Sequence, residues 1–276
     1  MCTAVLSLQP GQPAVLLGVR DEFTDRAWAP PGRHWPQHPG LIGGKDLLAG
    51  GTWLAVAPDE ARAACVLNGR GRPAEVATRR SRGVLPLLAA AGAPLDEAAL
   101  ADLDPFHLLT VWPDRAMLHS WDGVDLSERD LAPGLHIVVN DGLAADAAVW
   151  SATAPATGEP DGRAQELARI GHFAARFESS GTAWDSWRDL ADGDELDSDD
   201  PRALIVRRRL DDGRTWGTTS VSLVELSPAG VRYAFNARPG DRDGWYRVQL
   251  AAARRPDARA QAALTSPSSW RRQAPP

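Results

Sequence analysis

The residue with the clearest capacity for chemistry stands at the second position of the chain. Removal of Met1 would make Cys2 the first residue, so that a thiol and the α-amine would belong to one amino acid. An α-amine has a reference pKa of about 7.7–8.0, so near pH 7 it is partly neutral and can accept the thiol proton. A nucleophile activated by its own terminal amine is an established catalytic arrangement. The sequence therefore nominates Cys2 as a nucleophile, against the plain alternative that a cysteine after Met1 is chance.

Two charged residues follow the second apolar run of the chain, and a hairpin would return them to the start. The runs 2–8 and 14–19 flank the Pro- and Gly-containing stretch 9–13, which predicts a β-hairpin at the N-terminus. Arg20 could then lower the pKa of the thiol by its charge. Asp21 could accept hydrogen bonds from the α-amine and orient it. The alternative is an ordinary surface ion pair, which contributes little to stability.

Two asparagines end apolar runs farther along the chain. Asn68 closes the run 64–68, and Asn140 closes the run 137–140. An amide at a strand tip can donate to an oxyanion, an interaction that stabilises the transition state of acyl transfer. Asn is also common in turns for its own conformational reasons, so each position has a plain structural alternative.

Other familiar catalytic patterns are absent from the sequence. It holds no G-x-S-x-G elbow, no phosphate-binding P-loop and no Cys-x-x-Cys pair. His34 and His38 are four residues apart, but they lie in a proline-rich stretch without neighbouring cysteine or carboxylate ligands, which disfavours a zinc site. The remaining histidines are isolated and are typical of core or surface positions.

Composition narrows the class of protein and its partners. The 276 residues carry a net charge of −6, which disfavours a nucleic-acid binder because phosphate contacts need surplus Lys and Arg. No apolar run reaches the ~18–20 residues that cross a bilayer, and the start lacks the basic region of a signal peptide. We therefore expect no membrane span and a cytoplasmic protein. A disulfide between Cys2 and Cys65 is disfavoured in that reducing compartment.

The order of apolar patterns predicts an α+β protein with mostly antiparallel sheets. Strands are expected, besides the N-terminal hairpin, at 50–57, 62–68, 106–112, 116–121, 135–140, 203–210, 218–226, 231–236 and 245–250. Helices are expected at 82–91, 95–103 and 162–178, and loops at 29–40, 153–161 and 192–200. We predict one domain over residues 1–252 and a disordered tail over 253–276, which has few large apolar residues.

Short motifs in this order resemble those of the transport-and-Golgi-organisation (NRDE) family, over roughly residues 1–250. The motifs are Met1-Cys2, Val19-Arg20-Asp21-Glu22 followed by Phe23-Thr24-Asp25-Arg26, Gly50-Gly51-Thr52-Trp53-Leu54, Leu67-Asn68, Arg80-Ser81-Arg82-Gly83, Phe106-His107-Leu108, Pro133-Gly134-Leu135-His136 leading to Asn140, and Trp216-Gly217-Thr218-Thr219-Ser220.

The family in turn resembles the N-terminal nucleophile hydrolases, particularly the bile-salt and penicillin V acylase branch. This resemblance implies a four-layer αββα sandwich. It implies Cys2 as nucleophile, Arg20 and Asp21 as its organisers, and Asn68 and Asn140 as oxyanion and amine partners, with no cofactor required for hydrolysis.

Three positions depart from the patterns that the resemblance brings with it. Val19 stands where the family motif has Asn, and Thr219 stands where the late strand has Arg. His107 replaces the Asn usual in its motif. The departures at Val19 and Thr219 each remove a polar side chain, so they predict fewer polar contacts around the nucleophile, which we call a weakened shell.

Two functions stay open on these grounds. The first is hydrolysis of a C–N amide or thioester bond in a small acyl substrate through Cys2. The second, implied by the resemblance, is a non-enzymatic carrier of haem, acyl-CoA or another lipid, for which His34, His107 and His136 are candidate axial ligands of haem. A third alternative is a scaffold that meets a protein partner through the acidic stretch 192–200 or the arginine-rich tail.

Overall fold

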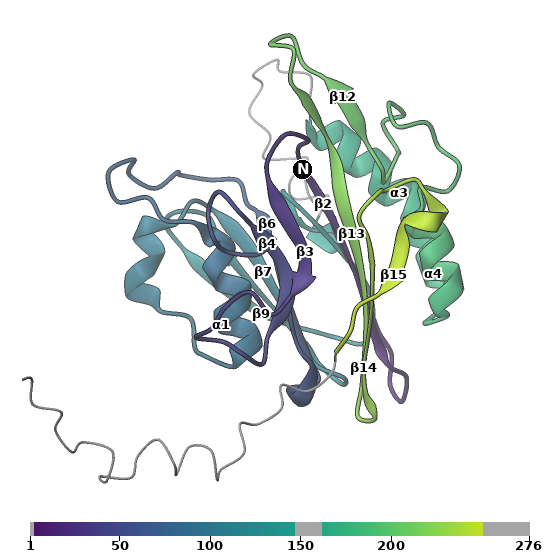
Figure 1. Cartoon of the computed structure of the whole chain (residues 1–276), viewed down its shortest axis with the longest axis horizontal. Coiled ribbons are helices and arrows are strands. Elements are labelled where there is room, and N and C mark those ends of the chain that lie inside the picture. Colours follow the sequence, from purple (N-terminus) through teal and green to yellow (C-terminus); the bar gives the residue numbers. More distant parts are fainter. Residues whose placement is uncertain (1–2, 147–161, 251–276) are drawn as a thin grey trace, which may run out of the picture.

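The computed structural model describes residues 3–146 and 162–250 of the chain. Within these residues the strands form two sheets, both visible edge-on in Figure 1. The first sheet has the order β11-β10-β1-β2-β13-β14-β15, with β12 beside β13, and the second has the order β3-β4-β5-β6-β7-β8-β9. The strand neighbours in both sheets pair antiparallel, as the sequence predicts.

The strands of the first sheet come from the start, the middle and the end of the described chain. They are β1 (Thr3–Leu8), β2 (Ala14–Phe23), β10 (Gly134–Val139), β11 (Gly142–Leu143), β12 (Arg207–Arg209), β13 (Thr215–Ser227), β14 (Gly230–Asn236) and β15 (Trp245–Arg247). The second sheet is built from consecutive strands. They are β3 (Trp28–Gly32), β4 (Ile42–Asp46), β5 (Leu54–Ala57), β6 (Arg62–Asn68), β7 (Phe106–Val111), β8 (Ala116–Trp121) and β9 (Leu126–Leu131).

Helices cover the outer faces of both sheets, which gives the expected four αββα layers. The α-helices are α1 (Leu85–Ala91), α3 (Gly162–Ser180) and α4 (Trp184–Ala191). In Figure 1, α1 lies outside the second sheet, and α3 and α4 lie outside the first. Short 3-10 turns occupy Pro58–Glu60, Arg82–Val84, Glu97–Asp102, Ala144–Asp146 and Arg242–Gly244.

Three buried apolar clusters lie in the three spaces between the four layers. The first contains Leu6 and Leu16 of the first sheet together with Leu54 of the second, so it fills the space between the sheets. A second cluster joins the first sheet to α3 through residues such as Phe173, and a third joins the second sheet to α1. Burial of this apolar surface from water stabilises the stack of layers.

Side chains of strand β2 pack on both faces of the first sheet. Successive side chains of a strand point to opposite faces. Leu16 therefore belongs to the inter-sheet cluster, whereas Leu17 and Val19 belong to the helix-facing cluster. The same alternation continues into the polar residues that follow, so Arg20 and Asp21 serve opposite faces of the first sheet.

The N-terminal hairpin is confirmed, and several other elements differ from the sequence predictions. The helix predicted at 95–103 is a 3-10 turn over Glu97–Asp102. The loop predicted at 29–40 begins within strand β3, where Pro30 and Pro31 are tolerated because β3 is an edge strand. Strands β4 and β9 and helix α4 were not predicted at all.

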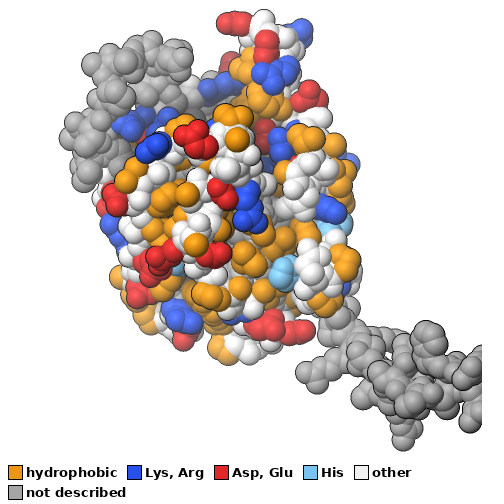
Figure 2. Space-filling model, turned by 90° about the vertical axis from the view of Figure 1, so that its left-hand side faces the viewer, with side chains coloured by type: hydrophobic (Ala, Val, Ile, Leu, Met, Phe, Trp, Pro, Cys, Tyr) orange, Lys and Arg blue, Asp and Glu red, His pale blue; other side chains and the backbone are white. Residues whose placement is uncertain are grey.

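The predicted linker at 153–161 and tail at 253–276 lie outside the described residues. In the described ranges, no helix is long and apolar enough to cross a membrane. On the face drawn in Figure 2, which is the α1 side, acidic and basic side chains are interspersed among hydrophobic ones.

Candidate active site

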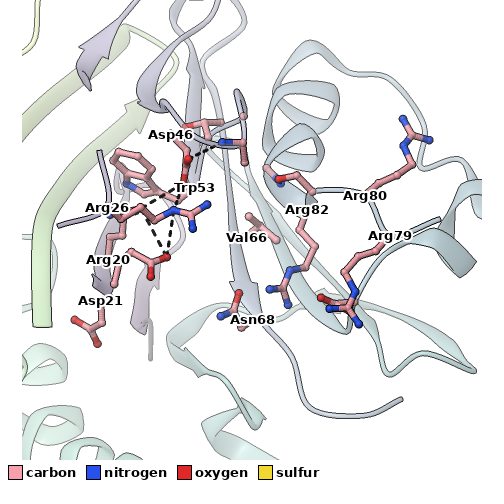
Figure 3. Close-up of a pocket in the computed structure, with 17 residues that line it drawn as sticks. Arg20, Asp21, Arg26, Asp46, Trp53, Val66, Asn68, Arg79, Arg80 and Arg82 are labelled. Atoms are coloured by element: carbon pink, nitrogen blue, oxygen red, sulfur yellow. Dashed lines mark hydrogen bonds and ion pairs between the residues drawn. The ribbon is translucent and has the colours of Figure 1, made fainter. Parts of the chain in front are cut away.

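A polar cleft of about 490 Å³ opens at one end of the space between the two sheets. One wall carries Arg20 and Asp46, the floor carries Val66 and Asn68, and the opposite wall is the arginine-rich segment 79–83 (Figure 3). A second, small cavity of about 20 Å³ shares Arg20, Trp53 and Val66 with the cleft and is otherwise lined mostly by apolar residues, together with Thr3. The cleft thus meets the start of β1.

Arg20 is buried in the cleft wall and is held from several sides. Its guanidinium donates to Oγ1 of Thr219 at 2.7 Å and lies 3.5 Å from a carboxylate oxygen of Asp46. It also stacks over the ring of Trp53, 4.5 Å from the centroid. With only 5% of its side chain exposed, Arg20 presents a fixed positive charge within the second half of β2, which continues to Phe23 and so is longer than the run predicted from sequence.

Asp46 balances much of that positive charge and was not predicted. It accepts a hydrogen bond from Nε of Arg26 at 2.7 Å and from the backbone amides of Leu48 and Ala49. Burial alone would favour the neutral acid, but these hydrogen bonds hold the pKa of Asp46 below its usual value. Asp46 therefore stays ionised and anchors both Arg20 and Arg26.

Asp21 points to the other face of the sheet, toward α3. Its Oδ1 accepts a hydrogen bond from Oγ1 of Thr218 at 2.7 Å, and its Oδ2 lies 3.9 Å from a guanidinium nitrogen of Arg169. Burial raises the pKa of Asp21, although Arg169 and the hydrogen bond from Thr218 act against that rise.

Arg169 connects Asp21 to the beginning of the chain. The same guanidinium nitrogen that approaches Asp21 donates to Oγ1 of Thr3 at 2.8 Å, and its Nε donates to the carbonyl of Ala203 at 2.9 Å. Arg169 is 2% exposed. Helix α3 thereby fixes Thr3, the residue that directly follows the candidate nucleophile.

The two departures at Val19 and Thr219 have structural explanations. Val19 is buried in the helix-facing cluster, so its apolar side chain suits its surroundings. Thr219 sits at a bulge in the pairing of β2 with β13, and its hydroxyl both accepts from the Arg20 guanidinium and donates to the Arg20 carbonyl. Thr219 therefore faces Arg20 and orients it.

The site residues predicted from sequence are only partly gathered in one place. Arg20 and Asn68 line the cleft, and Asp21 borders it although its carboxylate points to the helix side of the sheet. Asn140 is not among the residues that line it. It follows β10, which pairs with β1 through Ala4 and Val138. Cys2 lies outside the described residues.

A second cluster of charges surrounds the residue after Asn140. Asp141 lies 2.6 Å from Nε of Arg70 and receives two hydrogen bonds from Arg163, at 2.8 and 3.2 Å. Its backbone amide donates to Glu166 at 3.2 Å, and Glu166 also lies 3.6 Å from Arg70. Asp141 and Glu166 are buried, whereas Arg70 is about half exposed.

The pKa values of the two carboxyl groups in this cluster are shifted in opposite directions. Against the effect of burial, Arg163 and Arg70 hold the pKa of Asp141 below its usual value. Burial and the neighbouring Asp141 carboxylate raise the pKa of Glu166 to about 7, although Arg70 opposes that rise. Near neutral pH, Glu166 therefore exchanges a proton while Asp141 keeps its charge.

Replacing Glu166 by Gln should flatten the pH dependence of stability between pH 5 and 8. A carboxyl whose folded pKa is raised favours folding below its unfolded pKa, near 4.5, and loses that contribution as the pH rises through about 7. The loss amounts to at most about 3 kcal/mol. Denaturant unfolding at pH 5.5 and 8 measures it.

The wild-type free energy of unfolding should fall more across this interval than that of Glu166→Gln. Burial lowers the pKa of His107, which acts in the opposite direction in the same interval, but that effect is common to both proteins and cancels in the comparison. Equal slopes in the two proteins would contradict the proposed ionisation of Glu166.

The three candidate haem ligands lie outside the cleft and contact backbone carbonyls. Nε2 of His34 lies 2.8 Å from the carbonyl of Pro30, and Nε2 of His136 lies 2.7 Å from that of Ala132. His107 is buried between Oγ of Ser120 and the carbonyl of Asn140. In the described residues, no group of three or more His, Cys, Asp or Glu could hold a metal ion.

Several residues of the candidate site and of the charged clusters beside it escaped the residue-by-residue sequence reasoning. Trp53 and residues 80–83 of the cleft wall belong to short motifs on which the family resemblance rests. Those motifs were the signal that could have placed these residues in the site. Arg169 and Glu166 lie on one face of α3 with Arg163, at a spacing of three residues. A charged row on the apolar side of a predicted helix was the available signal.

Comparison with known proteins identifies a family over about half of the chain. A family model described as Transport and Golgi organisation 2 (TANGO2) matches residues 1–151. The matched range includes Arg20, Asp21, Asn68 and Asn140, but it ends before α3. No curated protein matches the chain.

Solved structures resemble the whole described fold. The C2A mutant of conjugated bile acid hydrolase from Clostridium perfringens has a TM-score of 0.52 at 10% identity, and the match covers 90% of this chain and 97% of that one. Penicillin V acylase from Agrobacterium tumefaciens has a TM-score of 0.48 at 13% identity, with 86% and 83% covered. At 10% identity the first likeness shows the fold alone, a four-layer αββα sandwich.

Proposed function

The chain belongs to the Transport and Golgi organisation 2 family, and from this premise we propose that it hydrolyses a C–N amide or thioester bond in a small acyl substrate through Cys2. The observation that carries the proposal is the cleft in which Arg20 and Asn68 meet the start of β1, one residue after Cys2. The structural relative described as a C2A mutant of a bile acid hydrolase supports the same position.

The proposed reaction begins with loss of Met1 and activation of the thiol. In β1, Ala4 and Leu6 belong to the inter-sheet cluster. Cys2 directly precedes this strand, and we propose that it is the nucleophile for substrates held in the cleft. The neutral α-amine accepts the thiol proton, and the nearby charge of Arg20 favours the thiolate.

Acyl transfer and hydrolysis then follow in two balanced steps. The thiolate attacks the acyl carbon, and Asn68 and Asn140 donate to the resulting oxyanion. The C–N or C–S bond breaks as the α-ammonium gives its proton to the leaving amine or thiolate. Water then attacks the thioester on Cys2 while the α-amine takes its proton, which releases the acid and restores the thiol.

Asp21 and Arg169 act as positioning residues in this proposal. Arg169 holds Thr3, and Thr218 and Arg169 hold Asp21 on the helix side of the sheet. A carboxylate in the second half of β2 can orient the α-amine for proton transfer. No cofactor takes part in these steps, and the reducing cytoplasm is the proposed setting because it keeps the thiol available.

Turnover of small probes tests the proposed reaction. The purified protein is incubated with S-phenyl thioacetate, and release of thiophenol is followed with a thiol reagent. We expect saturable release that requires the mature N-terminus, which mass spectrometry verifies on the same sample. Release no faster than that given by heat-denatured protein would contradict the proposal.

A carrier remains the second candidate, and one observation favours it. The wall formed by Arg79, Arg80 and Arg82 gives the cleft a basic side suited to the carboxylates of haem or the phosphates of acyl-CoA. Titration with haemin tests this function. The carrier predicts a saturable Soret shift that Arg80→Glu weakens, and an unsaturable titration would remove haem as the ligand.

A further inference from the structure

The two asparagines proposed to hold the oxyanion belong to different sheets. Asn68 ends β6 in the second sheet, and Asn140 follows β10 in the first. An oxyanion site shared between them needs the two sheets to keep a fixed spacing, because donors act only within hydrogen-bond reach of the developing charge. The fold must therefore supply a contact between the sheets near these residues.

Such a contact lies directly beside both asparagines. Arg70 stands two residues after Asn68, and Asp141 stands one residue after Asn140. Nε of Arg70 lies 2.6 Å from Oδ1 of Asp141, so one ion pair joins the two loops across the sheets. The Asp141 carboxylate is 2% exposed, so its end of the pair is shielded from solvent, whereas Arg70 is 49% exposed.

Local backbone structure fixes both partners of this ion pair. Gly71 has a φ of +147°, and a Cβ there would meet the carbonyl of Asp122 at 1.9 Å, so the loop that carries Arg70 can follow its path only with glycine. On the other side, Arg163 and Glu166 of α3 bind the side chain and the amide of Asp141.

The second sheet makes another contact with the same loop. Nε2 of His107, in β7, lies 3.2 Å from the carbonyl of Asn140, and Nδ1 of His107 lies 2.8 Å from Oγ of Ser120. The backbone of Asn140 is thus held to the second sheet on one side, and the next residue is held there by Arg70 on the other.

We propose that the Arg70–Asp141 ion pair is a clasp that sets the spacing of Asn68 and Asn140. Arg70 and Asp141 are then positioning residues for acyl transfer. The inference rests on the proposed function, since it assigns the ion pair a role in that reaction. Glu166, Arg163 and His107 are the other titratable or charged groups that face the clasp, and they hold the Asp141 side of it.

Two reagents separate positioning from simple structural support. Iodoacetamide alkylates any accessible thiolate and needs no oxyanion site, whereas p-nitrophenyl acetate acylates through a tetrahedral oxyanion. Mass spectrometry of the N-terminal peptide follows both modifications of Cys2. The variants are Arg70→Ala, Asp141→Asn and the two combined, with Arg70→Lys as the conservative replacement.

We expect Arg70→Ala and Asp141→Asn each to slow acylation by about 10- to 100-fold, because small displacements of catalytic groups are costly. Alkylation should keep the wild-type rate. The double variant should be no slower than the worse single variant, because both changes open the same clasp. Arg70→Lys keeps a positive charge in place and should recover part of the acylation rate.

A matched ion pair elsewhere provides the control. Arg129 of β9 and Asp146, which follows β11, lie 2.8 Å apart and also link the second sheet to the end of the first, but both side chains are well exposed and neither residue adjoins Asn68 or Asn140. Arg129→Ala should acylate at the wild-type rate.

The outcomes distinguish failure of the clasp from failure of the proposed function. If wild-type Cys2 is alkylated but never acylated, the hydrolase proposal falls and the clasp falls with it. If wild type is acylated and the clasp variants are acylated equally fast, or lose acylation and alkylation alike, only the clasp is overturned.

Discussion

Replacing Cys2 by Ala should abolish turnover of S-phenyl thioacetate, with a loss of at least about 10³-fold relative to the wild type. The reason is chemical, since alanine offers no atom that can form the acyl-enzyme bond. Cys2→Ser keeps a hydroxyl and should also be nearly inactive, because an α-amine with a pKa near 8 is a poor base for a hydroxyl group. Thiophenol release under saturating probe measures both variants.

Cys65 supplies the matched control for this prediction. It is the only other cysteine in the sequence and is 4% exposed in the inter-sheet cluster. Cys65→Ala removes a thiol of the same kind and should retain turnover. Full activity in Cys2→Ala, or a loss as large in Cys65→Ala, would show that Cys2 is not the nucleophile.

Arg169→Leu should lower the free energy of unfolding by about 3 kcal/mol. The substitution leaves the buried carboxylate of Asp21 without its charged neighbour on α3 and removes the hydrogen bond to Thr3. Because Thr3 directly follows Cys2, we also expect thioester turnover to fall by about 10²-fold. Denaturant unfolding and steady-state kinetics measure the two effects separately.

A second substitution separates stability from positioning. Combining Arg169→Leu with Asp21→Asn removes the uncompensated buried charge, so most of the lost stability should return while turnover stays low. Arg176→Leu changes an arginine on the same helix that is half exposed and pairs with Asp194, and it should affect neither quantity strongly. Restored turnover in the double variant would contradict the positioning role.

The N-terminal hairpin and the α+β class with antiparallel sheets could be predicted because they rest on local patterns, whereas the four αββα layers were implied by the family resemblance. Alternating apolar residues and the turn at 9–13 define β1 and β2 without reference to the rest of the chain. The edge strand β3 could not be predicted, since its two prolines suggest a loop and its pairing comes entirely from β4. Strand β3 forms because it pairs with β4, and the sequence of β3 by itself does not indicate a strand.

The candidate site likewise contains residues that local patterns predict and residues that only tertiary packing brings together. The sequence predicted that Arg20 and Asp21 both lie beside the thiol, because they follow an apolar run. In the structure, the alternation of side chains along β2 directs Arg20 to the cleft and Asp21 to the helix side of the sheet. Arg169 is 148 positions from Asp21 in the sequence and meets it only through the packing of α3 on the first sheet. Contacts between distant segments depend on tertiary packing, which residue type and local spacing do not specify.

Thr219 shows that a departure from the family pattern can have contacts that the sequence does not reveal. The loss of an arginine predicted a weakened shell, but the threonine hydroxyl at the β13 bulge binds both the side chain and the carbonyl of Arg20. The bulge that turns this side chain toward Arg20 is a feature of strand pairing, so a single sequence gives no sign of it.

Capture of the acyl-enzyme tests the central claim most directly. The protein is mixed with p-nitrophenyl acetate, quenched in acid within the first turnover, and examined by intact and peptide mass spectrometry. We predict a chain that lacks Met1 and carries one acetyl group on the sulfur of Cys2, which disappears as hydrolysis proceeds. Retained Met1, or acetylation confined to other residues, would contradict the assignment of Cys2 as an N-terminal nucleophile.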